Sequence, residues 1–197
     1  MRKFALATGA FFALASASVM AQDGYFFVNG NLGHSAYSAH YLNGWDQVAT
    51  QGALRLGYAW QGPVDVGVEA GYADLGRVTR HGAYEYLDHN GDNQYGSYRN
   101  ALSARGWLLG GNVKYNFDSA WYLSARAGFF EPTIDTKVSS DSANFRSSST
   151  STRGYAGVGG GYNFSPSWGL GVSYDYYNLG HTVGSANTFS VTAEMRF

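Results

Sequence analysis

The sequence lacks cysteine altogether, and it carries few charged residues. Without cysteine, neither a disulfide framework nor a thiolate metal site is available, so the fold must be stable without covalent cross-links. Only 14% of the 197 residues are charged. An ordinary soluble domain carries about a quarter, so this composition is atypical of one.

The chain also lacks a basic excess and, beyond its first residues, any long apolar run. Lys and Arg number 13 against 14 Asp and Glu, which gives a net charge of −1. Proteins that bind nucleic acid usually present a basic face, so we expect no nucleic-acid partner. A helix needs about 20 apolar residues to cross a bilayer, so transmembrane helices are excluded as well.

The N-terminus is typical of an export signal. Arg2 and Lys3 precede an uncharged apolar run of 11 residues, 4–14, and residues 19–21 fit a small-x-small cleavage site. We predict a cleaved signal peptide over 1–21 and one domain over 22–197, with a short N-terminal anchor helix as the alternative. Cleavage lowers the 13 basic residues to 11 against 14 acidic ones, a net charge of −3.

Glycine and aromatic residues are abundant instead. The chain has 27 Gly and 16 Tyr, and aromatics make up 17% of it. The glycine content is roughly double the usual share. Low charge, many aromatics and no helix-length apolar run suit a membrane β-barrel, whose strands need only about 10 residues with alternating faces.

Eight segments alternate with a period of two, which places successive side chains on opposite faces of a strand. One face carries no charge in the segments 26–32, 54–60, 64–72, 107–115, 121–129, 156–164, 168–176 and 189–197. The opposite face carries four basic and four acidic residues: Arg55, Lys114, Arg126, Arg196, Asp65, Glu69, Asp175 and Glu194. We predict an all-β fold, a closed eight-stranded antiparallel transmembrane β-barrel with up-and-down meander order. A soluble antiparallel sandwich also alternates and stays possible on composition alone.

Three similar short hairpins join these segments, and we centre them on Gly62, Asp118 and Ser165. This register pairs residues across each hairpin on the outer face, as Trp60–Val64, Tyr115–Trp121 and Tyr162–Trp168. Aromatic residues collect at the membrane–water interfaces of such barrels. We therefore predict an interfacial girdle of Trp60, Tyr115, Trp121, Tyr162 and Trp168.

The other four connections lie at the opposite end and cover 37–51, 74–101, 131–152 and 179–187; three of them are long and polar. Short periplasmic turns and longer external loops characterise outer-membrane barrels. The Ser/Thr-rich stretch 139–152 has low complexity, and we expect it to be mobile. Aromatics of the first two connections can form a binding patch, or these segments can extend the barrel as paired strands.

The strand ends carry motifs of a known family. Residues 71–76 (Gly-Tyr-Ala-Asp-Leu-Gly), 174–180 (Tyr-Asp-Tyr-Tyr-Asn-Leu-Gly) and the last strand resemble the outer-membrane barrel domain shared by OmpA, OmpX and Ail-type proteins, over the whole mature chain. The resemblance implies residence among bacterial outer-membrane lipids. It also implies that the barrel-assembly machinery reads Ser190, Met195 and Phe197, although Thr192 stands where Gly is common. OmpA-like proteins often continue into a peptidoglycan-binding domain; we expect no such activity, because this chain stops at the last strand.

An eight-stranded barrel has an interior only wide enough to be filled by side chains. Balanced inward charges then predict a sealed, ion-paired core, and the Gly62 hairpin sets Arg55 directly opposite Glu69. A proton or ion path, or a gate, is the second interpretation of these charges. We rank it below the structural one, because ion-pair networks also hold small barrels together. We expect interior ion pairs among Arg55, Glu69, Lys114, Arg126, Asp175 and Glu194.

Histidines beside hydroxyl residues are the obvious candidates for catalysis. His34-Ser35 ends the first strand, and His181-Thr182 lies in the last connection. Outer-membrane lipid A deacylases use a Ser–His pair within a barrel. Adjacent strand residues point to opposite faces, however, so His34 is poorly placed to serve Ser35. We predict that the protein is not an enzyme.

We expect neither a cofactor nor a metal. Asp88-x-Asn90-x-Asp92 is similar to the start of a calcium loop, but Asn93 replaces the turn glycine and Arg99 stands where a bidentate Glu belongs. The family resemblance implies a surface barrel with a structural or adhesive role and a host or matrix ligand held by its loops. A small channel or porin-like protein is the alternative, and a lipid A-modifying enzyme comes third.

Overall fold

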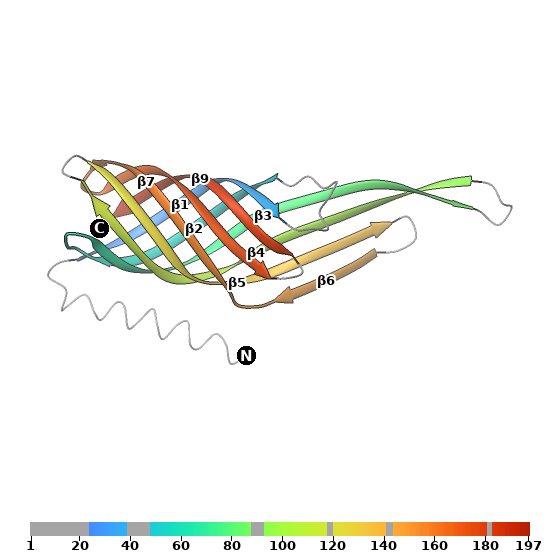
Figure 1. Ribbon diagram of the computed structural model, residues 1–197, viewed down its shortest axis with the longest axis horizontal. Helices are drawn as coiled ribbons and strands as arrows, with labels where there is room; N and C mark the ends of the chain where they lie inside the picture. Colours follow the sequence, from blue (N-terminus) through green and yellow to red (C-terminus); the bar gives the residue numbers. More distant parts are fainter. Residues whose placement is uncertain (1–23, 39–47, 88–92, 118–119, 141–143, 181–182) are drawn as a thin grey trace.

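The computed structural model describes residues 24–38, 48–87, 93–117, 120–140, 144–180 and 183–197 (Figure 1). The predicted signal peptide, 1–21, lies outside these ranges. Within them, no helix is long and apolar enough to cross a membrane. The regular structure that they contain is β-strand.

The strands of the described ranges are β1 (Gly24–Ser38), β2 (Val48–Trp60), β3 (Asp65–Leu87), β4 (Asn93–Asn116), β5 (Trp121–Ser140), β6 (Asn144–Thr150), β7 (Arg153–Ser165), β8 (Trp168–Gly180) and β9 (Gly184–Arg196). Eight of them form a closed ring in the order β1-β2-β3-β4-β5-β7-β8-β9, and β9 returns to pair with β1. β6 stands outside the ring and pairs with the far part of β5. The predicted closed, eight-stranded antiparallel barrel is confirmed.

Alternation along each strand decides which side chains face the lumen. Trp107 is 68% exposed and its neighbour Leu108 only 3%; Val68 is 37% exposed and Glu69 only 4%. Closure leaves the barrel without sheet edges, so its backbone groups are satisfied between strands, as lipid requires. The outward-facing side chains are mostly apolar, which also suits contact with lipid. Large exposed side chains form an apolar belt around the barrel, which includes Leu32, Leu54, Val66, Val68, Tyr72, Trp107, Leu109, Leu123, Phe129, Val158, Leu170, Val172, Phe189 and Val191.

The registers of the three short hairpins differ from the prediction by two residues. Arg55 pairs with Gly71 rather than with Glu69. Pro63 and Pro166 lie in the first and third turns, where they cannot donate a ladder hydrogen bond. In the third hairpin Ser165 pairs with Trp168 across a two-residue turn, and the register shifts again between Asn163 and Ser165. A shift of two keeps every side chain on its predicted face. The observed outer-face pairs are Trp60–Val66, Tyr115–Leu123 and Tyr162–Leu170, in place of the predicted pairs with Val64, Trp121 and Trp168.

Two of the long connections are paired strands rather than loops. β3 and β4 pair as far as Leu87 and Asn93, and β5 and β6 pair over 133–139 and 144–150. The outer parts of these four strands form a sheet that extends beyond the barrel (Figure 1), which we call the projecting sheet. Pairing of β3 with β4 confirms the alternative of paired strands for most of 74–101, whereas the expectation of a loop over 131–152 is wrong over most of its length. Mobility of the stretch 139–152 stays a prediction. Strand pairing satisfies the backbone N–H and C=O groups that point toward a neighbouring strand. β3 beyond Asp74 and β6 each pair on one side only in the described part of the chain.

A β-bulge marks the point at which β3 leaves the barrel. The β3–β4 register shifts between Asp74 and Arg77, and the pairing of β2 with β3 ends at Asp74. Gly76 has a φ of +78°, and a Cβ at this position would clash with the carbonyl oxygen of Thr50. The bulge therefore depends on glycine.

Candidate functional site

Charged and polar side chains fill the half of the lumen nearer the short hairpins. Arg55 is fully buried, and its Nε lies 3.5 Å from Glu69 Oε1. The two residues are diagonal neighbours, because Arg55 pairs with Gly71 and Glu69 lies two positions away on β3. Long side chains can reach across such a diagonal. The two predicted partners therefore lie together even though the predicted register is wrong.

Hydrogen bonds from other strands surround this pair. Arg55 Nη2 donates to the Tyr177 hydroxyl oxygen at 2.9 Å. Glu69 accepts from the Tyr155 hydroxyl at 2.8 Å and from Asn112 Nδ2 at 3.0 Å. These bonds offset part of the desolvation that burying a charged pair costs.

The second ion pair joins Arg126 and Asp175 across the strand that lies between them, at the position of a glycine. Arg126 Nε and Nη2 donate to the two carboxylate oxygens of Asp175 at 2.6 and 3.1 Å. Arg126 on β5 and Asp175 on β8 both pair with Gly157 of β7. A Cβ on Gly157 would clash with the Asp175 carboxylate. Glycine at this position leaves the space in which the bidentate contact forms.

The third group lies at the short-hairpin end of the lumen. Lys114 Nζ pairs with Glu194 Oε1, and Arg196 Nε lies 3.4 Å from the same oxygen. Asp65 instead accepts a hydrogen bond of 3.1 Å from the Tyr25 hydroxyl. The six residues singled out from the sequence as interior partners thus meet in three pairs.

A small polar cavity remains between these groups. It has a volume of about 40 Å³ and is lined in part by Glu69, Lys114, Arg126 and Glu194. A water molecule needs roughly 10–15 Å³ of such space, so the cavity has room for a few waters at most. It is too small for a water column along the barrel.

The other half of the lumen is filled by a cluster of buried hydrophobic side chains that was not predicted. We call it the apolar layer, and it consists of Tyr37, Ala49, Ala73, Leu75, Val78, Leu102, Ala104, Leu108, Phe130, Tyr155, Tyr177, Leu179, Val183 and Ala186. Several of its members lie in segments expected to be loops. The period of two through Leu102, Ala104 and Leu108 is the signal that could have revealed them.

The Ser–His candidate of β1 does not form a catalytic pair. The buried Ser35 hydroxyl donates to a backbone carbonyl of β3 at 2.5 Å. His34 is exposed on the outer face, opposite Phe189 of β9. His181 and Thr182 lie outside the described residues, as does the calcium-like pattern at 88–92.

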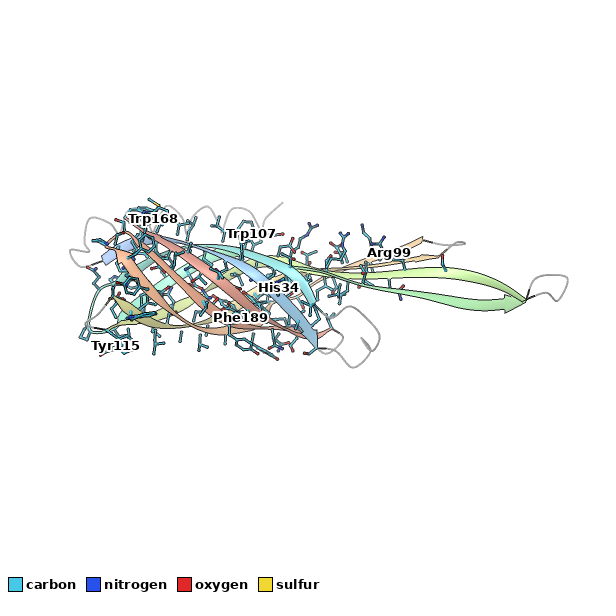
Figure 2. All side chains as sticks on the ribbon, turned by 90° about the horizontal axis from the view of Figure 1, so that it is seen from above. His34, Arg99, Trp107, Tyr115, Trp168 and Phe189 are labelled. Carbon is cyan, nitrogen blue, oxygen red and sulfur yellow. The ribbon has the colours of Figure 1, made fainter. Side chains whose placement is uncertain are left out.

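Aromatic side chains lie at both edges of the apolar belt. Trp121 and Tyr162 pack edge to face with ring centroids 5.2 Å apart, and Figure 2 shows Tyr115 and Trp168 at the same short-hairpin end. Tyr72 and Trp107 pack in the same way at 5.3 Å near the projecting sheet. Aromatic residues at two rims are typical of membrane–water interfaces. The predicted girdle residues are all exposed: Trp60, Tyr115, Trp121, Tyr162 and Trp168.

The C-terminal strand closes the barrel against β1. Phe26 and Phe197 exchange backbone hydrogen bonds of 2.9 and 3.0 Å. Met195 and Phe197 are exposed on the outer face, whereas Ser190 is buried in the lumen, where it accepts a hydrogen bond from Gln51. Reading of Ser190, Met195 and Phe197 by the barrel-assembly machinery stays a prediction.

Comparison with protein families gives a match over almost the whole chain. The family described as "Outer membrane protein beta-barrel domain" matches residues 4–197. No curated protein matches the chain.

Several solved structures are similar. Ail, the attachment invasion locus protein of Yersinia pestis, solved in complex with the heparin analogue sucrose octasulfate, is 16% identical with a TM-score of 0.53, over 90% of this chain and 100% of that one. The N-terminal β-barrel domain of Pseudomonas aeruginosa OprF is 16% identical with a TM-score of 0.47, over 89% and 98%. Neisserial surface protein A is 15% identical with a TM-score of 0.45, over 88% and 97%. At these identities the likeness shows the fold alone.

Proposed function

The chain belongs to the outer membrane protein beta-barrel domain family, and on that premise we propose that it is a non-enzymatic surface protein whose projecting sheet has an adhesive or structural role. The protein resides in the bacterial outer membrane. Outer-membrane barrels have short periplasmic turns and longer external segments. The projecting sheet therefore faces the cell's surroundings.

The projecting sheet is the observation that carries the proposal. β3 continues from Asp74 to Leu87, which at about 3.3 Å per residue is roughly 40 Å of strand. It is paired throughout that length except at the bulge, and β4, β5 and β6 widen it into a sheet. A preordered surface loses less conformational entropy on binding than flexible loops do. Such a sheet suits contact with a large host or matrix molecule.

The Ail complex suggests which ligand class to test first. Ail was solved with a heparin analogue, so a sulfated matrix polysaccharide is the first candidate that we propose for this chain. Protein components of the matrix are the second class that we propose to test.

A shortened hairpin tests the proposal. Residues 81–99 are replaced by Asn-Gly, which joins Arg80 to Asn100, two residues that already pair across β3 and β4. Asn-Gly is well suited to a two-residue hairpin turn. Cells with the intact protein should adhere to heparin-coated or matrix-coated surfaces more than cells without it, and the shortened protein should remove most of that gain.

The control is the folded state of the shortened barrel. An unboiled sample should still migrate differently from a boiled one in detergent electrophoresis, because edge-free hydrogen bonding keeps the barrel intact. Equal adhesion with the intact and the shortened protein, at equal surface levels, contradicts the proposal.

The alternatives have less support. A porin-like channel needs a water column, whereas the described lumen has a cavity of about 40 Å³ and an apolar layer. A lipid A-modifying enzyme needs a nucleophile beside its base, whereas Ser35 and His34 lie on opposite faces of β1.

A further inference from the structure

A groove of about 270 Å³ lies where the projecting sheet leaves the barrel. Side chains of β3, β4 and β5 line it, among them the cations Arg77, Arg105 and Lys137 and the carboxylates Asp74 and Asp135. We call it the lateral groove. The three ion pairs of the lumen use other residues, so the groove is a separate site.

The lateral groove opens sideways and not into the lumen. On β4, Ser103 and Arg105 continue the outward-facing series of Trp107, which is 68% exposed. Arg77 of β3 and Asp135 of β5 pair with Ser103 from its two sides, so they lie on the same outer face. A ligand therefore reaches the groove from beside the barrel and not through the lumen.

The cations of the groove lie directly beyond the apolar belt. Tyr72 and Trp107 form the edge of the belt on β3 and β4. Arg105 is the next outward-facing residue after Trp107, about 7 Å along the strand. The polar headgroup layer is roughly 5–8 Å thick on each side of the hydrocarbon core, and barrel strands cross it at a tilt of about 45°. The groove is thus at the level of lipid headgroups.

Two of the cations have no ion-pair partner in the described part of the chain. Arg105 Nη2 lies 3.6 Å from Asp135 Oδ2, and Asp74 Oδ1 accepts the backbone N–H of Gly76 at 2.9 Å. Arg77 and Lys137 are exposed, and neither forms an ion pair with a described residue. An anion in the groove would find these two positive charges available.

The β-bulge at 74–77 makes the groove a built feature of the fold. Bulges bend a strand and redirect a side chain. Gly76, with its φ of +78°, packs so closely on β2 that no other residue fits without a shift. The bulge places Arg77 opposite Ser103, beside the Arg105–Asp135 pair.

We propose that the lateral groove binds the phosphate of a phosphorylated glycolipid in the outer leaflet of the outer membrane. Arginine donates paired N–H groups to phosphate oxygens, and lysine adds a point charge. The acyl chains of the same lipid can lie against Trp107 and Leu109 on the apolar belt. A soluble anion lacks this second contact, so the position of the groove favours the lipid. The proposal does not depend on the adhesive role of the sheet.

Binding of lipid A to the purified full-length barrel in mixed detergent micelles tests the proposal. Native mass spectrometry gives the mole fraction of lipid A at which half of the protein carries lipid, for the bis-phosphorylated lipid and for its dephosphorylated form. A cation near an anionic surface strengthens binding about fivefold, so Arg77→Gln should weaken binding of the phosphorylated lipid about fivefold and Arg77→Gln/Lys137→Gln about 25-fold. The dephosphorylated lipid should bind weakly to all three proteins.

Arg99→Gln is the matched control. Arg99 is exposed on the same face of β4, and Figure 2 shows it farther along the projecting sheet than Trp107. This variant should change lipid binding less than twofold. If the double variant fails to fold, as judged by its unboiled migration, the two single variants decide the outcome.

Three results would overturn the proposal. The first is equal affinity for phosphorylated and dephosphorylated lipid A. The second is a loss with Arg99→Gln as large as that with Arg77→Gln, which would mean general charge attraction. The third is full displacement of lipid A by sucrose octasulfate or inorganic phosphate at equal anion concentration, which would assign the groove to free anions from the medium.

Discussion

Tyr155 and Tyr177 stack in the lumen, with ring centroids 5.9 Å apart and planes 17° from parallel. The Tyr155 hydroxyl donates to Glu69, and the Tyr177 hydroxyl accepts from Arg55. Both rings also belong to the apolar layer. The stacked pair therefore joins the polar half of the lumen to the hydrophobic half, so a change at either ring should affect both.

Tyr177→Phe tests this junction. The substitution keeps the stacked ring and leaves Arg55 Nη2 without its acceptor, and a buried donor without a partner costs about 1–3 kcal/mol. The free energy of unfolding in urea, measured in detergent micelles, should fall by that amount. Tyr174→Phe is the control, because Tyr174 is exposed on the outer face and its hydroxyl donates to Asn187. Equal losses of unfolding free energy in the two variants would show that the Tyr177 hydroxyl does not stabilise the Arg55–Glu69 pair.

Glu69→Ala should destabilise the barrel strongly. It leaves the Arg55 guanidinium, which is fully buried, without its counter-ion. Removing one member of a buried ion pair typically costs about 3–5 kcal/mol. Glu131→Ala is the matched control at an exposed position, where substitutions usually change stability by less than about 0.5 kcal/mol. A small effect of Glu69→Ala in urea unfolding would show that the pair does not support the fold.

Val68→Arg tests which face of the barrel contacts lipid. An arginine at the middle of the lipid face costs about 2–4 kcal/mol, and the cost falls toward the interface. Ser148→Arg, exposed on the projecting sheet, should be nearly neutral. Gly67 is unsuitable as a control, because a Cβ there would lie 2.8 Å from the Tyr58 carbonyl oxygen. Similar losses for the two arginines, measured by unfolding from bilayers, would mean that residue 68 does not face lipid.

The faces of the strands could be predicted from the sequence, whereas the registers could not. A period of two assigns faces without any knowledge of the turns. Register depends on where each turn lies and on bulges beside it, and the turns at Pro63 and Pro166 give registers that differ from the predicted ones by two residues. Arg55 and Glu69 were predicted as partners on a wrong register and still meet, because an even shift keeps both in the lumen.

The apolar layer and the lateral groove were missed for one common reason. Both lie in segments that are rich in polar residues, and this composition is typical of loops. On β4, Leu102 is in the lumen and Arg105 faces outward, which is the same alternation that runs through the barrel. On β3, Leu75 is in the lumen and Arg77, only two residues later, faces outward. The bulge at Asp74 shifts the phase of β3. A search for an uninterrupted period of two therefore places the end of the strand at the bulge, although β3 continues to Leu87.

Conductance in a planar bilayer tests most directly that the protein is a sealed surface barrel and not a pore. The purified protein should give no steady, porin-sized steps, because the apolar layer closes one half of the lumen and three ion pairs fill the other. Glu69→Ala should lower stability without opening a large channel. Reproducible large steps in the wild type, with an ion selectivity that Glu69→Ala alters, would contradict the account and make the interior charges part of a filter.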